Sequence, residues 1–151
     1  MTTTQTERST LNETDSADLT QTLLYRLRRV QQRAAAMFVD TIGDTQITPT
    51  QWAVLTTLKR HGALSQNQLG RLTYMDPATT QGVILRLADR NMVERRPDPG
   101  DRRRTSVSLS KAGAAFVDQL TDNSKRANER VMEPLTAAER ETLLRLLEKL
   151  M

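Results

Sequence analysis

Two short helix signatures followed by a hairpin signature, near the middle of the chain, constrain the fold most strongly. Ser65 with Gln68 three residues later forms a capping box, which marks a helix N-terminus. Asp76 followed by Pro77 marks a second start, because an acidic cap and a proline at the first helical position both favour initiation. Further on the apolar period changes to two, and we read the runs VERR and TSVSLS as short strands around a Pro-Gly turn. The order predicts a helix-turn-helix followed directly by a hairpin, which is a winged helix.

Longer amphipathic helices precede this unit. Apolar residues at three- and four-residue steps predict a helix from about Asp18 to Ile42. Its apolar stripe consists of Leu23, Leu27, Val30, Ala34, Met37 and Phe38. Thr48-Pro49 then starts a second helix that ends at His61-Gly62.

Two more helices follow the hairpin. Ser110 caps a helix from Lys111 towards Met132, and a last helix follows a threonine cap with Glu139 three positions on. The chain is therefore mostly α, with a small β-wing. The stripes at Leu23/Leu27/Val30 and Leu143/Leu147/Leu150 are too apolar to face water alone, so we expect an obligatory homodimer that buries both.

The helix that begins at Asp76-Pro77 has two different faces. Its core stripe is Thr80, Val83, Ile84, Leu87 and Ala88. Its opposite face carries Ala78, Thr79, Gly82, Arg86 and Asp89, with Gln81 and Leu85 at the edge. In a helix-turn-helix the second helix enters the major groove, so this face is the candidate for reading bases.

Positive charge gathers in the middle third of the chain. The segment 59–111 contains eleven Lys/Arg and five Asp/Glu, a balance of +6, whereas 1–58 and 112–151 each have a balance of −1. Arg102, Arg103 and Arg104 follow the Pro-Gly-Asp turn at the hairpin tip, from which they could reach phosphates or the minor groove. The distribution is typical of a module that binds a polyanion. A solvated basic face without a ligand is the alternative.

Composition excludes several functions. The chain has no Cys and one His, which removes disulfides, sulfur-ligated zinc and a His-rich metal site. Nucleophile–base pairs are equally hard to assemble, so we expect no enzyme, no cofactor and no metal. No apolar run approaches the roughly 20 residues of a membrane span, and we expect a soluble cytoplasmic protein. Residues 1–17 are Thr/Ser-rich and read as a flexible arm.

The run LTTLKRHGALSQNQLGRLTYMDPATTQGVILRLADRNMVERRPDPGDRRRTSVSLSKAG resembles the MarR family of bacterial transcription regulators. The resemblance extends over most of the chain from about residue 19. It implies a dimer, held by the first and last helices, that places two winged helix-turn-helix lobes on a pseudo-palindromic operator. It also implies repression that a small ligand relieves, typically an aromatic or phenolic acid. The expected organisation is one integrated domain with a dimerisation region at 18–46 and 112–151 and a DNA-binding lobe at 47–111.

The resemblance also suggests roles for single residues. Asp101 and Arg103 match the family's wing Asp-x-Arg, in which the acid steadies the arginine for the minor groove, with Arg102 and Arg104 as auxiliary phosphate contacts. Arg86 matches a position that contacts the DNA backbone, although a salt bridge to Asp89 or Asp101 is an alternative. The base-facing start of the recognition helix corresponds to Ala78, Thr79, Thr80 and Gln81, of which Gln81 could bind adenine in bidentate fashion. Gly82 departs from the family, which often has a basic residue there, so a close approach of the backbone to DNA could replace base readout by a side chain at this position.

Candidates for an effector site lie where the dimer helices meet the lobe. Arg29 and Arg33 could clamp a carboxylate, although a solvated face is more common for such residues. His61 could contribute to binding the effector, or it could simply stabilise the negative C-terminal end of its helix. Trp52 could form an aromatic lid or belong to the core. The competing function of another class is a winged-helix module that binds an acidic protein partner.

Overall fold

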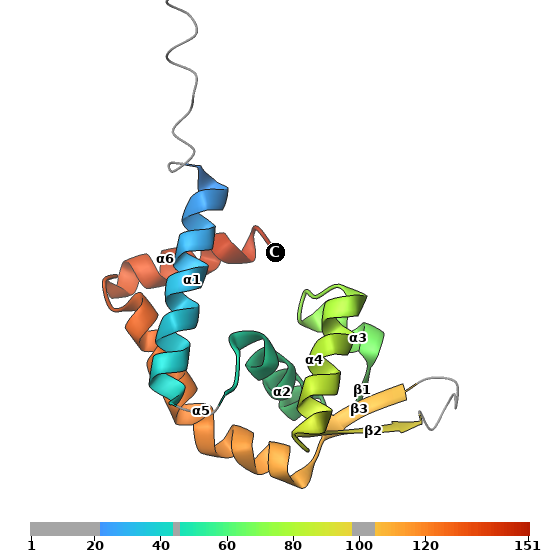
Figure 1. Ribbon diagram of the computed structural model, residues 1–151. Coiled ribbons are helices and arrows are strands. Elements are labelled where there is room, and N and C mark those ends of the chain that lie inside the picture. Colours follow the sequence, from blue (N-terminus) through green and yellow to red (C-terminus); the bar gives the residue numbers. More distant parts are fainter. Residues whose placement is uncertain (1–21, 44–45, 98–104) are drawn as a thin grey trace, which may run out of the picture.

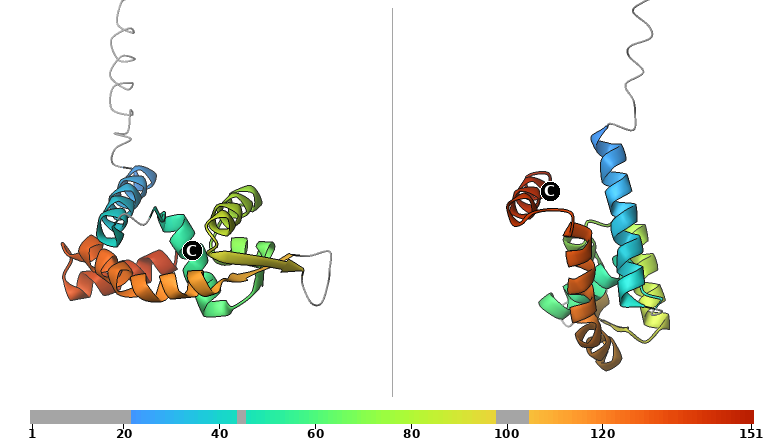
Figure 2. Two further views of the ribbon diagram at one scale, coloured as in Figure 1. Left: turned by 60° about the horizontal axis from the view of Figure 1, so that its bottom comes forward. Right: turned by 90° about the vertical axis from the view of Figure 1, so that its left-hand side faces the viewer.

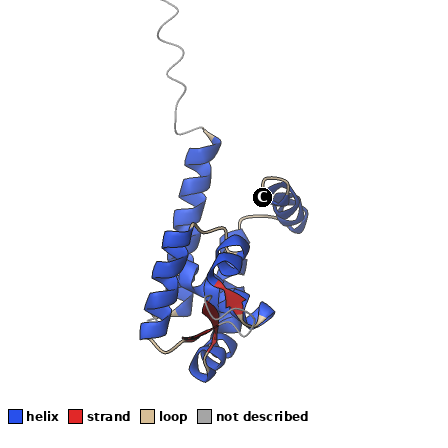
Figure 3. Ribbon diagram, turned by 90° about the vertical axis from the view of Figure 1, so that its right-hand side faces the viewer, coloured by secondary structure: helices blue, strands red, loops and turns tan. Residues whose placement is uncertain are grey.

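The computed structural model describes residues 22–43, 46–97 and 105–151. Most of these residues are helical, and a small antiparallel sheet accompanies the helices (Figures 1 and 3). In chain order the elements are α1 (Leu23–Ile42), α2 (Pro49–His61), β1 (Leu64–Ser65), α3 (Gln66–Leu72), α4 (Pro77–Asp89), β2 (Val93–Pro97), β3 (Thr105–Leu109), α5 (Lys111–Met132) and α6 (Ala137–Glu148). The mostly α fold with a β-wing is the one that the sequence predicts.

Side-chain caps start the helices where the sequence predicts them. The caps are Thr48, Ser65, Asp76, Ser110 and Thr136, and each accepts a hydrogen bond from the backbone N–H three residues on. The predicted start of the first helix near Asp18 is wrong. Thr22 caps α1 through the N–H of Tyr25, so the helix begins at Leu23.

The sheet has one strand more than the sequence predicts. β2 and β3 form the expected hairpin, with Arg95 opposite Val107, and the short strand β1 adds to the other edge of β3. The strand order is β1-β3-β2. A two-residue strand is too short to show a period of two, which explains why the pattern did not reveal it. Through β1, the start of α3 is fixed directly to the wing.

One hydrophobic core holds the lobe together. Its fully buried apolar side chains come from α2, α3, α4 and β3: Val54, Leu55, Leu58, Leu69, Val83, Leu87 and Val107. Gly70 allows α3 and α4 to approach closely, because a Cβ there would lie 2.9 Å from Thr80 Oγ1. Gly113 does the same for α5, where a Cβ would meet the Met92 carbonyl. These contacts fix the orientation of α4 relative to the wing.

The two long helices α1 and α5 lie side by side, next to the lobe (Figures 1 and 2). An ion pair joins them, in which Arg130 Nη1 lies 2.6 Å from Asp40 Oδ2 and also donates to Thr41 Oγ1 at 2.9 Å. The first half of α5 in turn joins the lobe, where Lys59 Nζ pairs with Asp118 Oδ2 at 2.9 Å. α5 therefore links α1 to the lobe, in addition to the direct contact between α1 and α2.

The first half of α1 and all of α6 present apolar side chains to solvent. α6 stands apart from the lobe and has no buried residue (Figure 3). The exposed apolar side chains there include Leu23, Leu24, Leu27 and Val30 of α1, Leu143, Leu144 and Leu146 of α6, and Leu150 just after α6. Apolar surface of this extent is typical of a subunit interface, and the homodimer stays a prediction. Within the described segments, no helix is both long enough and apolar enough to cross a membrane.

Candidate nucleic-acid interface

One face of α4 is exposed and carries the side chains that the sequence analysis assigned to DNA. Ala78, Thr79, Gln81 and Arg86 are all solvent-exposed. The opposite face of α4 enters the core through Val83, Ile84 and Leu87. The helix thus presents its outer face beside the wing, in the arrangement of a winged helix-turn-helix (Figure 1).

Thr80 differs from this expectation. Its side chain is fully buried, and its hydroxyl donates to the Asp76 carbonyl oxygen at 2.8 Å. Because it lies against Gly70 of α3, it serves the contact between the two helices and cannot reach DNA. The assignment of Thr80 to the DNA-binding set is therefore wrong. Its place in the core stripe, which the period also indicated, is confirmed.

Asp76 organises the exposed first turn of α4. Its Oδ1 accepts from the Thr79 N–H at 2.8 Å, and its Oδ2 accepts from the Thr79 hydroxyl at 2.6 Å. The hydroxyl bond and then the backbone bond lower the pKa of Asp76. The carboxylate is therefore kept ionised, and it holds the Thr79 side chain in one orientation at the start of the exposed face.

Arg86 lies along the helix towards its N-terminus. Its guanidinium would be 3.6 Å from a Cβ placed on Gly82, so it covers that glycine. Among the described side chains Arg86 makes no ion pair with Asp89, which removes one of the two alternatives for it. Asp101, the other alternative partner, lies outside the described residues.

The wing brings further cations to the same region. Arg95 and Arg96 of β2 are exposed, and Arg96 Nη2 pairs with Glu94 Oε2 at 2.6 Å. Asp101, Arg102, Arg103 and Arg104, which the sequence analysis assigned to the wing tip, lie outside the described residues. Their roles stay predictions.

A hollow of about 700 Å³ between α3 and α4 was not foreseen from the sequence. Its polar and aromatic lining includes Gln66, Asn67, Arg71 and Tyr74. Gln66 Nε2 donates to the Pro77 carbonyl oxygen at 3.2 Å, which joins the starts of the two helices. Tyr74 is exposed and has a φ of 53°, an unusual value for a non-glycine residue. The hollow adds one more cation, Arg71, beside the start of α4.

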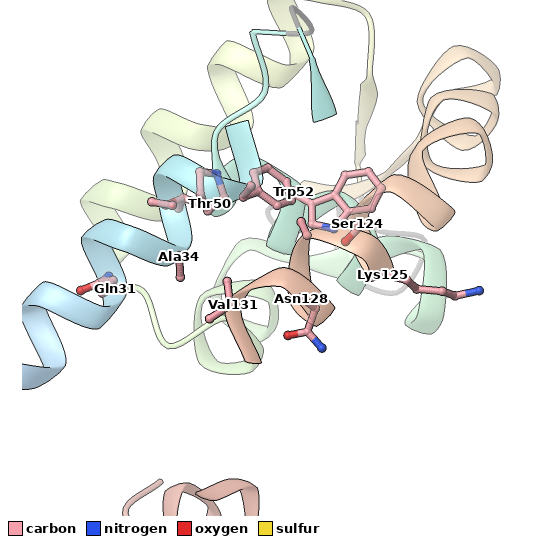
Figure 4. A pocket seen from close by; sticks show the side chains of 12 residues that line it. Gln31, Ala34, Thr50, Trp52, Ser124, Lys125, Asn128 and Val131 are labelled. Atoms are coloured by element: carbon pink, nitrogen blue, oxygen red, sulfur yellow. The ribbon is translucent and has the colours of Figure 1, made fainter. Parts of the chain in front are cut away.

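A second pocket, of about 620 Å³, lies where α1, α2 and α5 meet (Figure 4). Apolar and aromatic side chains form most of its wall, and the rings of Phe38 and Trp52 lie 6.2 Å apart. Its polar rim is formed by Gln31, Thr50, Ser124, Lys125 and Asn128. A mostly apolar pocket with a few polar groups is the usual form of a small-molecule site.

The structure brings one of the four effector candidates to this pocket, namely Trp52. Arg29, Arg33 and His61 are exposed and do not line it. Arg29 instead lies over the Tyr25 ring, 5.9 Å from its centroid. The cation that lines the pocket is Lys125 of α5. In Figure 4 its side chain extends from the edge of the pocket away from the Trp52 ring, and its Nζ pairs with Asp122 Oδ1 at 3.2 Å.

The described segments contain no cluster of three or more His, Asp or Glu side chains that could hold a metal ion.

A repressor from Pseudomonas putida, the HTH-type transcriptional repressor NicR, is 38% identical to this chain over 88% of the chain and 84% of its own length. The model of the MarR family matches residues 47–105, from the start of α2 to the wing. The chain belongs to the MarR family.

Solved structures agree with this membership of the MarR family. A probable transcriptional regulator from Pseudomonas aeruginosa superposes with a TM-score of 0.83 at 45% identity, over 88% of this chain and 99% of the other. BpsR of Bordetella bronchiseptica, whose DNA binding is regulated by 6-hydroxynicotinic acid, gives a TM-score of 0.82 at 34% identity, over 87% and 94%. This MarR-family chain is therefore a DNA-binding regulator of transcription.

Proposed function

We propose that this regulator is a repressor that binds a pseudo-palindromic operator as a homodimer and leaves it when a small aromatic acid binds. The observation that carries the proposal is the position of the 620 Å³ pocket, which is lined jointly by α1, α2 and α5. α1 carries exposed apolar surface for a second subunit, whereas α2 belongs to the core of the lobe. A ligand in this pocket therefore contacts both the dimerisation region and the DNA-binding lobe.

The proposed DNA contacts follow from the exposed face of α4 and from the wing. In this proposal Gln81 reads a base edge, with Ala78 and Thr79 beside it, and Arg86 binds the DNA backbone. At the wing tip, Arg103 enters the minor groove with Asp101 as its support, and Arg102 and Arg104 bind phosphates. Gln66, Asn67 and Arg71 on α3 are placed for further phosphate contacts, because the first helix of the motif crosses the backbone.

The proposed ligand is a small aromatic acid, of which 6-hydroxynicotinic acid is one example. Phe38 and Trp52 offer an apolar wall to an aromatic ring, and Lys125 at the edge of the pocket supplies a positive charge to a carboxylate when its side chain turns from Asp122 towards the ligand. Asn128 and Ser124 supply donors and acceptors for ring substituents. The regulation of BpsR by 6-hydroxynicotinic acid supports the same ligand class for this chain.

Trp52 makes the proposal directly testable, because it is the single tryptophan of the chain and it lines the pocket. Titration with 6-hydroxynicotinic acid and with substituted benzoates should change its fluorescence with saturation. Lys125→Gln should weaken binding of the acids at least tenfold, whereas the corresponding amides should bind the variant and the parent protein alike. Arg126→Gln is the matched control, because it removes the neighbouring cation of α5, which does not line the pocket. If both substitutions weakened acid binding equally, Lys125 would not be a specific ligand contact.

A further inference from the structure

Gly82 lies in the middle of α4, where glycine is unfavourable. After proline, glycine is the residue that least favours a helix interior, because its backbone loses the most freedom on folding. α4 spans Pro77–Asp89, so Gly82 is more than a turn from either end and has no role as a cap. A residue that weakens a helix at its centre needs a physical reason.

The fold supplies such a reason for the other described glycines. Gly43 and Gly62 end their helices with φ values of 80° and 76°, which side chains rarely tolerate. Gly70 and Gly113 lie at close approaches between elements, where a Cβ would come within 2.9 Å and 1.9 Å of its nearest neighbour. Replacing any of these four would strain the protein itself.

The fold supplies no such reason for Gly82. A Cβ built there meets only the guanidinium of Arg86, at 3.6–3.9 Å, which is ordinary van der Waals contact. Its φ is not positive, since within the described residues the positive-φ glycines are Gly43 and Gly62. An alanine would therefore fit the free protein without displacing a neighbour, and it would favour the helix.

The surroundings of Gly82 show which face of α4 the missing side chain affects. Ala78 and Thr79 lie four and three residues earlier, on the same exposed face, and both are small. Gln81 and Arg86 flank this stretch with long polar side chains. Between them α4 carries little side-chain bulk of its own, but the Arg86 guanidinium lies over Gly82, so a base edge reaches the backbone there only when Arg86 turns outward to the DNA backbone, as the proposed function has it. The part of the helix without side-chain bulk is thus the part that the proposed function directs at DNA.

We propose that Gly82 is a specificity-determining residue, because the missing side chain lets the α4 backbone approach a base edge in the major groove more closely than a Cβ would allow. The base pair opposite Gly82 is then selected by its shape, while Gln81 reads an adjacent position through hydrogen bonds. A base edge is favoured over a phosphate because the N-terminal half of a recognition helix contacts base edges. This inference rests on the proposed function, in which α4 enters the major groove.

The test compares full-length Gly82→Ala with the parent protein on a duplex that the parent enriches from a random-sequence pool. We expect the melting temperature of the free variant to rise by about 2–4 °C, as for a helix-favouring substitution in a domain of this size. Its affinity for the selected duplex should fall at least tenfold. A selection repeated with the variant should change preference at one or two adjacent positions in each half-site. Gly82→Leu should lose more affinity than Gly82→Ala, because its side chain is larger.

Gln119→Ala is the matched control. It introduces the strongest helix former at an exposed position of α5, away from the proposed contacts, and should leave DNA affinity unchanged. Unchanged affinity in Gly82→Ala would overturn the inference while leaving the proposed function in place. Equal loss on every sequence, without a local change in preference, would overturn the assignment to a base edge. A lower melting temperature would show that the fold itself requires the glycine. Failure of the parent protein to enrich any duplex would contradict the proposed function, on which the inference depends.

Discussion

The ring of Phe38 on α1 lies against the ring of Trp52 on α2, with centroids 6.2 Å apart and planes inclined by 49°. Both rings line the pocket at the junction of the long helices and the lobe. A ligand that separated them would act on α1 and on the lobe at the same time. The pair is therefore the contact through which we expect ligand binding to change the orientation of the lobe.

Replacing Phe38 should uncouple the ligand from DNA. Phe38→Ala removes one wall of the pocket, so the acid should bind more weakly and no longer reduce DNA affinity. Phe38 is partly buried, and we expect a cost to stability of about 3 kcal/mol, the low end of the range for such truncations. Phe38→Leu, which keeps apolar volume, serves as the control and should retain most of the stability. Chemical denaturation and DNA titrations with and without acid measure both effects. A Phe38→Ala protein that responds to the acid like its parent would contradict the coupling.

Arg103 and Gln81 should affect DNA binding differently. Arg103→Ala should weaken binding to most sequences and lower the slope of log affinity against log salt by about one unit. Gln81→Ala should instead relax preference at one base step, at a cost of about 1–3 kcal/mol. Binding assays over a salt series and a panel of single-base variants separate the two effects. Identical profiles for the two variants would refute the division between wing and helix.

A charge within the apolar stripe of α1 should prevent dimerisation. Leu27 is exposed on the first half of α1, and Leu27→Glu would place a carboxylate in the proposed subunit interface. We expect a monomer by sedimentation and the loss of tight operator binding together. Gln32→Glu is a control that adds the same charge to the same helix, outside the apolar stripe. A Leu27→Glu protein that stays dimeric would show that another surface joins the subunits.

Asp76 should make the stability of α4 depend on pH. Because the folded-state pKa is lowered, ionised Asp76 stabilises the fold above its unfolded pKa, near 3.8, and this contribution is lost as pH falls through the folded value. The carboxyl resonance of Asp76 should therefore titrate below 3.8. Asp76→Asn keeps a cap but should lose this part of the dependence of melting temperature on pH. A titration midpoint at or above 3.8 would contradict the hydrogen-bonded cap.

Local signals predicted the fold well, because caps act within three or four residues of chain. Thr48, Ser65, Asp76, Ser110 and Thr136 each fixed a helix start that the structure confirms. The start near Asp18 was wrong because the cap at Thr22 overrides an apolar period that continues upstream.

The candidate sites were harder to predict where they depend on long-range packing. The exposed face of α4 followed from the helical period. Thr80 was assigned both to the core stripe and to the DNA-binding face, and the structure buries it. Lys125 lines the pocket only because α5 packs beside α1. It lies 73 positions after Trp52 and 87 after Phe38, too far for a common sequence signal. Gln66, Asn67 and Tyr74 were missed for a different reason, since the conformation of the turn between α3 and α4 creates their hollow and helical periodicity does not report it.

The most direct measurement of the central claim is enrichment of duplexes from a random-sequence pool by the full-length protein, followed by affinity measurements over a salt series. We predict a pseudo-palindromic motif with half-sites about one helical turn, or roughly 10 base pairs, apart, because two-fold related helices must enter successive major grooves. Log affinity should fall linearly with log salt by about 0.9 per neutralised phosphate. Recovery of no common motif, together with a flat salt response, would contradict the account.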